Sequence, residues 1–441
     1  MKKNDLSLPY DIEKQLEEFK ISHKNGFKDE RLANRWKDIF IGITGAKTCK
    51  VAQIAAHSPH QTKNIWYTQK AMYGFLKNPK FTKEKILLPL YEKTKRDFSE
   101  EKEITAIIDL SPIEKPYSRK MEKLGRVLRK DKEGTVNGYT MLQVILVSNN
   151  KTGIGYFDIL AQGESWQNVE IEKAMEHSKG LLPGEADITW VWDRGFDDKK
   201  NYEQIISMKQ KFVGRFYHNR NVEDEKEKIK IFDLRLSKEC LVYAEIKYKG
   251  KKRKIEMKLK WGRCKVEGNL CWVLRSEIKK VEGIEEIERF KRERVWWLIT
   301  NHKINNEKKA IKVWELYRTR WKIEEFFKFL KQGLGLEEFQ ILGFEGIRKL
   351  MATAVIAGSF IYDLGASDDM EFIQLFALLG GWNGQGKIGK YLIKNGLSMW
   401  ITYFRVSSFV ETLSPREKEM LERFSLKFLG LSPKEGKISK D

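Results

Sequence analysis

The chain has 441 residues and a formal net charge of +21 at pH 7, with 41% hydrophobic residues and 12% aromatic residues. This composition is too apolar for a disordered chain, and 33% charged residues are too many for an integral membrane protein. The four cysteines show no zinc-ligand spacing and the first residues lack an apolar signal-peptide segment, so we expect a cytoplasmic protein. A pI near 9.5 indicates a polyanionic partner, most often nucleic acid. A membrane-surface binder or an unrelated basic protein is the alternative.

Residues 1–99 are predicted to form a helical DNA-binding domain, because apolar segments recur there with helical spacing, beginning at residues 16–19. Within it, residues 50–78 are basic and fit two short helices around a Ser-Pro break. Four aromatic side chains are interleaved with these bases: Trp66, Tyr67, Tyr73 and Phe75. Such a module could lay a helix on DNA. It fits equally a small bundle whose aromatic residues form the core, and the sequence leaves both interpretations open.

Residues 100–218 change to apolar, β-branched segments with intervening helices, which predicts an α/β core with a mixed sheet. Strands are predicted at residues 104–110, 135–148, 152–160, 186–193 and 211–217. Helices are predicted at residues 169–181 and 199–209. The second and third strands are separated by a polar turn at Asn149, which is typical of a hairpin.

The alternation of strands and helices is interrupted at residues 219–292, where period-2 segments predict a β-rich insertion. The core is predicted to resume over residues 293–366, with an apolar strand at 294–300 and a long helix beginning near Ala310. Residues 367–441 are predicted to form a helical C-terminal region with a charged end.

Two carboxylates stand at comparable places in the predicted core. Asp109 lies near the end of the first strand and Asp193 at the end of the fourth, and α/β sheets place ligands at that edge. Gly195, just past Asp193, allows the chain to turn tightly there. A chain with 62 acidic residues also places some at strand ends by chance, so each acid alone is weak support for a site.

The predicted helix after Ala310 carries polar residues along one side. At roughly 100° per residue, four of them fall within an arc of about 60°. These four are Tyr317, Arg320, Glu324 and Lys331. An apolar stripe beside them consists of Leu316, Ile323, Phe327, Leu330 and Leu334. An ordinary amphipathic helix with solvated charges is the alternative, but two bases spaced about an acid beside a buried stripe favour a functional face.

The spacing Tyr317-x2-Arg320-x3-Glu324-x6-Lys331 resembles the signature of the DDE transposases of bacterial insertion sequences. Other segments resemble the same family: residues 107–115 around Asp109, 188–196 around Asp193, 211–216 with Arg215, and 294–301 ending in Thr300 and Asn301. The insertion before the glutamate also matches the layout of that family. The resemblance covers roughly residues 105–363, is weaker over the N-terminal helices and has no motif in the tail.

This resemblance implies a ribonuclease H-like fold in which Asp109, Asp193 and Glu324 are catalytic and bind Mg²⁺ or Mn²⁺ as a pair of ions. Two such ions can activate a nucleophile and stabilise the leaving oxygen at phosphorus, and Mg²⁺ prefers carboxylate oxygens. Arg320 and Lys331 would hold DNA phosphates, and Tyr317 would donate a hydrogen bond to the same group.

The function expected from these features is cut-and-paste DNA transposition. The protein would cleave the ends of an insertion sequence and join them to target DNA, with double-stranded DNA as partner and a dimer as the DNA-bound form. We expect no membrane partner and no nucleotide cofactor, and a location at the nucleoid of a bacterial cytoplasm. A ribonuclease H-like nuclease without integration and a non-catalytic basic DNA-binding protein are the alternatives.

Overall fold

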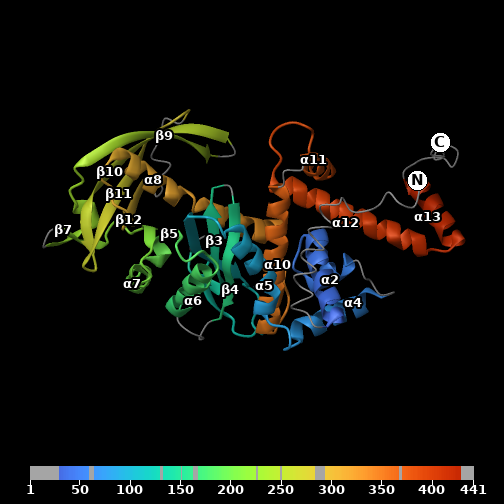
Figure 1. Cartoon of the computed structure of the whole chain (residues 1–441). Coiled ribbons are helices and arrows are strands. Elements are labelled where there is room, and N and C mark those ends of the chain that lie inside the picture. The colour runs from blue at the N-terminus through green and yellow to red at the C-terminus, as the bar shows by residue number, and fades with distance from the viewer. Residues whose placement is uncertain are drawn as a thin grey trace.

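The computed structural model shows a mixed α/β protein built around one twelve-stranded sheet (Figure 1). It describes residues 29–58, 64–129, 133–149, 151–161, 167–224, 227–248, 251–283, 294–366 and 370–428. The helix predicted around residues 16–19 and the charged end of the tail lie outside these ranges. Within them, the α/β class predicted from the sequence is confirmed.

One half of the sheet contains the strands predicted for the core. They are β1 (Glu103–Glu114), β3 (Thr135–Ser148), β4 (Lys151–Leu160), β5 (Asp187–Trp192) and β6 (Lys211–Arg215). The short strand β2 (Gly125–Leu128), which pairs with β3, was not predicted. The central strand β1 pairs antiparallel with β3 and parallel with β5, which in turn pairs parallel with β6. The hairpin predicted at Asn149 joins β3 to β4, and Asn149 takes the positive φ of 49° that this turn needs.

The other half of the sheet is the predicted β-rich insertion. Its strands are β7 (Asn221–Asp224), β8 (Glu227–Lys230), β9 (Lys238–Tyr248), β10 (Lys251–Val266) and β11 (Asn269–Val281), followed by β12 (Val295–Thr300). β12 pairs antiparallel with β6 on one side and with β11 on the other. The insertion therefore extends the sheet of the core. Its boundaries at residues 219 and 292 remain a prediction from the sequence.

Helices cover both faces of the core strands. Because side chains alternate along a strand, Ile108 and Leu142 belong to one core and Ile107 and Met141 to the other. The first core includes residues of α6 (Gln167–Gly180) and α7 (Lys199–Ser207). The second includes residues of α5 (Lys83–Asp97), α8 (Glu307–Arg318), α9 (Trp321–Lys328) and α10 (Phe344–Gly365). β1 and β3 are thus buried on both faces, which explains their nearly continuous apolar sequences.

The N-terminal helices are α2 (Glu30–Ala46), α3 (Val51–Ala56), α4 (Ile65–Lys77) and α5. Side chains of Asp29, Asn64 and Thr82 accept hydrogen bonds from backbone N–H groups at the starts of α2, α4 and α5. Of the interleaved aromatic residues, Phe75 is buried in the core, whereas Trp66 and Tyr67 are 55% and 58% exposed. The bundle interpretation is therefore right for Phe75, and Trp66 and Tyr67 lie on the surface.

Two C-terminal helices, α10 and α12 (Lys390–Thr412), pack against the N-terminal ones. α10 is the central helix of this part (Figure 1), and it packs against α2, α4, α5, β4 and α12. The hydroxyl of Ser398 on α12 donates a 2.6 Å hydrogen bond to the carbonyl of Gly45 on α2. Two further helices, α11 (Met370–Leu379) and α13 (Pro415–Phe428), complete the described tail. No helix in the described ranges is long and apolar enough to cross a membrane.

The long helix predicted from near Ala310 is divided into α8, α9 and a π-helical turn at Phe329–Gly333, and Thr319 and Arg320 between α8 and α9 keep helical backbone angles. Between α8 and α9 the backbone tightens: the N–H groups of Arg320, Lys322 and Ile323 each bond to the carbonyl three residues earlier. The hydroxyl of Thr319 also donates to the carbonyl of Leu316 at 2.6 Å. The spacing of roughly 100° per residue therefore does not hold from Tyr317 to Lys331.

Candidate active site

Asp109 and Asp193 lie where two neighbouring strands separate. The parallel pairing of β1 with β5 ends at Ile107 and Val191, whereas β1 continues to Glu114 along β3. Asp109 is thus in the middle of β1 rather than near its end, but it lies two residues beyond the last pair with β5. Asp193 directly follows β5. The two carboxylates therefore occupy the same edge of the sheet, as the sequence predicts.

Arg320 lies at the centre of the predicted acids. Its Nη1 atom is 2.6 Å from Oε1 of Glu324 and 3.7 Å from Oδ2 of Asp109, and only 6% of the residue is exposed. The turn between α8 and α9 places Arg320 one turn before Glu324, so that both side chains face β1. One guanidinium thus holds two of the three carboxylates together.

Tyr317 and Arg215 hold the third carboxylate. The hydroxyl of Tyr317, at the end of α8, donates a 3.4 Å hydrogen bond to Oδ1 of Asp193. Nη1 of Arg215, at the end of β6, lies 3.9 Å from the same oxygen. Arg215 was assigned no role from the sequence. Its position at the end of the strand beside β5 is the signal that could have identified it.

The pKa values of the two aspartates shift in opposite directions. Burial raises the pKa of Asp109 to about 7, with a further contribution from the charges of Asp193 and Glu324, although Arg320 opposes the shift. Burial also disfavours ionisation of Asp193, but Arg320, the backbone N–H of Arg194 and Arg215 outweigh it and lower the pKa of Asp193. The site thus combines one ionised aspartate with one that gains and loses its proton near neutral pH.

Lys331 lies in the π-helical turn after α9. Its Nζ atom donates a 2.5 Å hydrogen bond to the carbonyl of Pro112, three residues beyond Asp109 on β1, and lies 3.6 Å from Glu337. The sequence predicts Lys331 on the same helical face as Arg320 and Glu324, and both Lys331 and Arg320 contact β1. Lys331 connects the end of β1 to the segment after α9.

Thr300 and Asn301 end β12 beside the start of β6. The amide of Asn301 accepts from the backbone N–H of Phe212 at 2.9 Å and donates to the carbonyl of Gln210 at 2.9 Å. The Thr300 hydroxyl donates to the carbonyl of Phe212. These bonds fix β12 against β6, the strand that positions Arg215. The Thr-Asn pair therefore helps to place Arg215 without contacting the acids itself.

The three acids supply oxygen ligands of the kind that Mg²⁺ and Mn²⁺ prefer. In the described ranges, however, no three acidic, histidine or cysteine side chains lie close enough together to hold a metal ion as they stand. The positive charge of Arg320 occupies the space between Glu324 and Asp109. The donor set therefore fits a divalent cation provided that the guanidinium of Arg320 moves away from at least one carboxylate.

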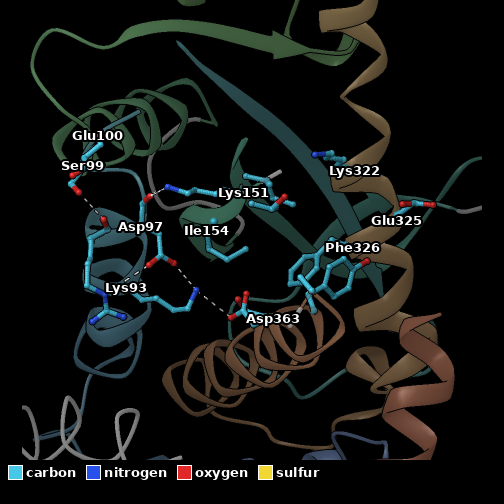
Figure 2. Close-up of a pocket in the computed structure, with 17 residues that line it drawn as sticks. Lys93, Asp97, Ser99, Glu100, Lys151, Ile154, Lys322, Glu325, Phe326 and Asp363 are labelled. Carbon is cyan, nitrogen blue, oxygen red and sulfur yellow. Dashed lines mark hydrogen bonds and ion pairs between the residues drawn. The ribbon is translucent and has the colours of Figure 1, made fainter. Parts of the chain in front are cut away.

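A hollow of about 740 Å³ lies on the other side of α9 from these acids, between α5, the β3–β4 hairpin and α10 (Figure 2). Lys322 and Phe326 reach into it from α9. Figure 2 shows Lys93 of α5 between two carboxylates, 2.7 Å from Asp97 and 3.4 Å from Asp363. These ion pairs balance the charge of Lys93, so this hollow is not a strongly basic surface.

A second hollow, of about 350 Å³, lies where β1 and β5 begin. We call this space the basic hollow, because five lysines line it. They are Lys211, Lys303, Lys309, Lys312 and Lys322. Two acids also line it, and both are paired, Glu103 with Lys312 at 2.9 Å and Asp187 with Lys211. Burial and the nearby lysines lower the pKa of His302 in this lining to about 4.

The sequence model of the transposase DDE domain matches residues 102–358 of this chain, which is more than half of its length. The matched range begins just before β1 and ends within α10, so it contains all six predicted site residues. The chain belongs to the DDE transposase family. A comparison with curated proteins gives no similar relative.

Proposed function

We propose that this protein is a cut-and-paste transposase that cleaves double-stranded DNA at the ends of an insertion sequence and joins them to target DNA. The observation that carries the proposal is the convergence of Asp109, Glu324 and Asp193, through Arg320 and Tyr317, at one edge of the sheet. Membership of the DDE transposase family supports the same conclusion.

The strand order supports a ribonuclease H-like core. β4, β3, β1, β5 and β6 are consecutive neighbours, with antiparallel pairs on the β3 side of β1 and parallel pairs on the β5 side. This arrangement brings two acids from neighbouring strands to one edge. The glutamate comes from α9, which packs over β1 and β3. The three acids therefore come from three different elements: Asp109 from β1, Asp193 from the end of β5 and Glu324 from α9.

In the proposed mechanism Asp109, Asp193 and Glu324 bind one or two Mg²⁺ or Mn²⁺ ions. Such ions supply activation of a water or 3′-hydroxyl nucleophile and stabilisation of the leaving oxygen. In the metal-free protein Arg320 offsets the charge of the same carboxylates, since like charges on partly buried groups at one site are unfavourable without a charge partner. When DNA and cations arrive, Arg320 turns to a DNA phosphate, to which its planar guanidinium can donate two hydrogen bonds.

Tyr317 and Lys331 complete the proposed DNA contacts. Burial keeps the pKa of Tyr317 above its ordinary value, so the phenol retains its proton and can donate a hydrogen bond to a phosphate oxygen in place of the one to Asp193. Lys331, whose Nζ atom bonds to Pro112 on β1, provides a positive charge beyond Asp109. Because two element ends must be joined, we propose a DNA-bound dimer, acting at the nucleoid in a bacterial cytoplasm.

The test uses the DNA that flanks the gene. Oligonucleotides with the terminal repeats are incubated with the protein and Mg²⁺ or Mn²⁺, and cleavage and strand transfer are measured separately. Asp109→Asn, Asp193→Asn and Glu324→Gln should each abolish both steps. Cleavage without strand transfer would indicate the alternative nuclease. If all three variants processed DNA like the wild type, a non-catalytic DNA-binding protein would be the correct interpretation.

Recognition of the element ends is proposed for the N-terminal helices. Trp66 and Tyr67 protrude from the first turn of α4, and Nζ of Lys70 lies 5.1 Å from the Trp66 ring, which leaves an aromatic and basic surface for DNA. The double variant Trp66→Ala, Tyr67→Ala should lose preference for element ends over random DNA while its melting temperature is unchanged. Phe232→Ala, another exposed aromatic residue at 51%, is the matched control.

This test requires the whole chain. α2 and α5 pack against α10, and residues from all three helices belong to one core. A fragment ending near Ser99 would expose that core to water, so its failure to bind DNA would say nothing about Trp66 and Tyr67. An unchanged preference for element ends in the full-length double variant would contradict this assignment.

A further inference from the structure

Gln143 lies directly opposite Asp109 in the sheet. The two residues are register partners in the antiparallel pair of β3 and β1. Side chains paired in this way point to the same face, with Cβ atoms about 5 Å apart. On this face Met141 and Ile145, two residues before and after Gln143, belong to the core that contains residues of α9. Gln143 therefore shares with Asp109 the space beneath the helix that carries Glu324.

The side chain of Gln143 is completely buried, and among the residues that the structure describes neither its Oε1 nor its Nε2 atom has a hydrogen-bond partner. A buried amide without partners costs free energy that an apolar side chain of similar size would not. The neighbouring positions Met141 and Ile145 are apolar and well buried. Packing of this core therefore gives no reason for a glutamine at position 143.

The strand next to Gln143 is also irregular. The register of β3 with β4 shifts between Val144 and Ile145, which leaves Gly155 as an extra residue on β4. The carbonyl of Gly155 bonds instead to Nδ1 of His177 on α6, at 2.9 Å. Bulges of this kind change the direction of nearby side chains and are common beside active sites. The bulge thus lies one residue away from the pair of Gln143 and Asp109.

We propose that Gln143 is a positioning residue for Asp109. When Arg320 turns away from the carboxylates, Nε2 of Gln143 donates a hydrogen bond to one oxygen of Asp109 and leaves the other for the cation. The inference rests on the proposed function, since it takes Asp109 as a metal ligand. Carboxylate ligands are ordinarily held by such outer hydrogen bonds, and losing one reduces metal affinity or activity by about 10- to 100-fold.

The experiment compares Gln143→Leu and Gln143→Met with the wild type. Mn²⁺ binding is measured by calorimetry on the DNA-free protein, melting temperature with and without Mn²⁺, and cleavage with element-end DNA. Both variants should melt at or above the wild-type temperature without metal, because they remove an unpaired buried amide. Both should nevertheless bind Mn²⁺ about 10- to 100-fold more weakly and gain less thermal stability from it.

The matched control is Ser276→Ala. Ser276 on β11 is also completely buried with an unpaired hydroxyl, but it lies in the insertion half of the sheet. It should keep wild-type Mn²⁺ affinity and cleavage. Wild-type Mn²⁺ affinity in Gln143→Leu and Gln143→Met would overturn the inference, and so would a lower melting temperature of both without metal, which would make Gln143 a structural residue.

Asp109→Asn separates failure of this inference from failure of the proposed function. If Asp109→Asn loses Mn²⁺ binding and cleavage while both Gln143 variants retain them, only the role of Gln143 is wrong. If Asp109→Asn binds Mn²⁺ and cleaves DNA like the wild type, the metal-binding assignment itself is wrong. A wild-type protein that binds no Mn²⁺ would overturn both.

Discussion

Arg320 and Glu324 form an ion pair with 2.6 Å between Nη1 and Oε1, one turn apart at the start of α9. The same Nη1 atom lies 3.7 Å from Oδ2 of Asp109, so one buried guanidinium offsets the charge of two carboxylates in the metal-free chain. This arrangement explains how a carboxylate cluster is tolerated in the folded, metal-free chain. In the proposed mechanism, Arg320 can contact a DNA phosphate only after it leaves these carboxylates.

The first prediction concerns Arg320→Ala. Without metal, the variant should be destabilised by about 2 kcal/mol, because partly buried carboxylates lose their charge partner. Saturating Mg²⁺ should restore part of this loss, since the cation then takes over the neutralising role. Urea unfolding with and without Mg²⁺ measures both effects. A loss of stability that is equal with and without Mg²⁺ would show that Arg320 and the cation do not share the same site.

The second prediction concerns two neighbouring glutamates on α9. Glu324→Gln should abolish cleavage while DNA affinity is unchanged or slightly raised, because the variant loses a negative charge that faces phosphate. Glu325→Gln is the matched control, since Glu325 lines the hollow of about 740 Å³ on the other side of α9. It should cleave at the wild-type rate in single-turnover assays. Normal cleavage by Glu324→Gln would mean that Glu324 is not part of the site.

The local features of the fold could be predicted from the sequence, because they depend on neighbouring residues. The hairpin at Asn149 and the placement of Asp193 after β5 follow from short-range patterns of apolar and turn residues. The break between α8 and α9 was not predicted, because the apolar stripe of Leu316, Ile323 and Phe327 runs through it without interruption, although the bond of the Thr319 hydroxyl to the carbonyl of Leu316 is itself local. The π-helical turn at Phe329–Gly333, which contains Lys331, was likewise not predicted.

The contacts between side chains of different strands in the site could not be predicted from sequence patterns either. The pairing of Gln143 with Asp109 depends on the register between β1 and β3, which the alternation of side chains fixes only to within two residues. Arg215 approaches Asp193 because β6 lies parallel to β5. A motif along the chain predicts the three acids, whereas the sheet determines which basic side chains lie beside them.

The third prediction is a pH dependence of stability. The pKa of Asp109 is about 7 in the folded chain, against roughly 3.9 when unfolded. Between these values the folded protein binds more protons than the unfolded one, so the contribution of Asp109 makes stability fall as pH rises from about 4 to 7. The total effect is at most about 4 kcal/mol, and less because the side chain is 17% exposed.

Asp109→Asn isolates this contribution from those of other titrating groups. Urea unfolding of wild type and variant without metal, at pH 5 to 8, should show the variant gaining stability relative to the wild type as pH rises. Because cations bind the ionised carboxylate, wild-type cleavage at limiting Mg²⁺ should also rise through about pH 7. A difference in stability between the two proteins that stays constant with pH would contradict the raised pKa of Asp109.

The fourth prediction concerns the basic hollow, at the edge of the sheet opposite to the acids. Along β1 the distance from Glu103 to Asp109 is about 20 Å, so DNA phosphates bound in the hollow belong to a different stretch of DNA from the one being cut. Lys303 and Lys309 are exposed residues of its lining. Lys303→Glu combined with Lys309→Glu should weaken binding to random duplex and reduce the slope of log K against log salt by about two.

The matched control reverses two exposed lysines outside the hollow, Lys228→Glu and Lys230→Glu on β8. Because both double variants change the net charge equally, general attraction of DNA to the basic protein should fall by the same amount in each. Only the loss of direct phosphate contacts distinguishes them, so the Lys303 and Lys309 variant should show the larger change in slope. Cleavage at saturating DNA should be unaffected, since the acids are untouched. Equal slopes in the two double variants would show that the hollow does not hold DNA.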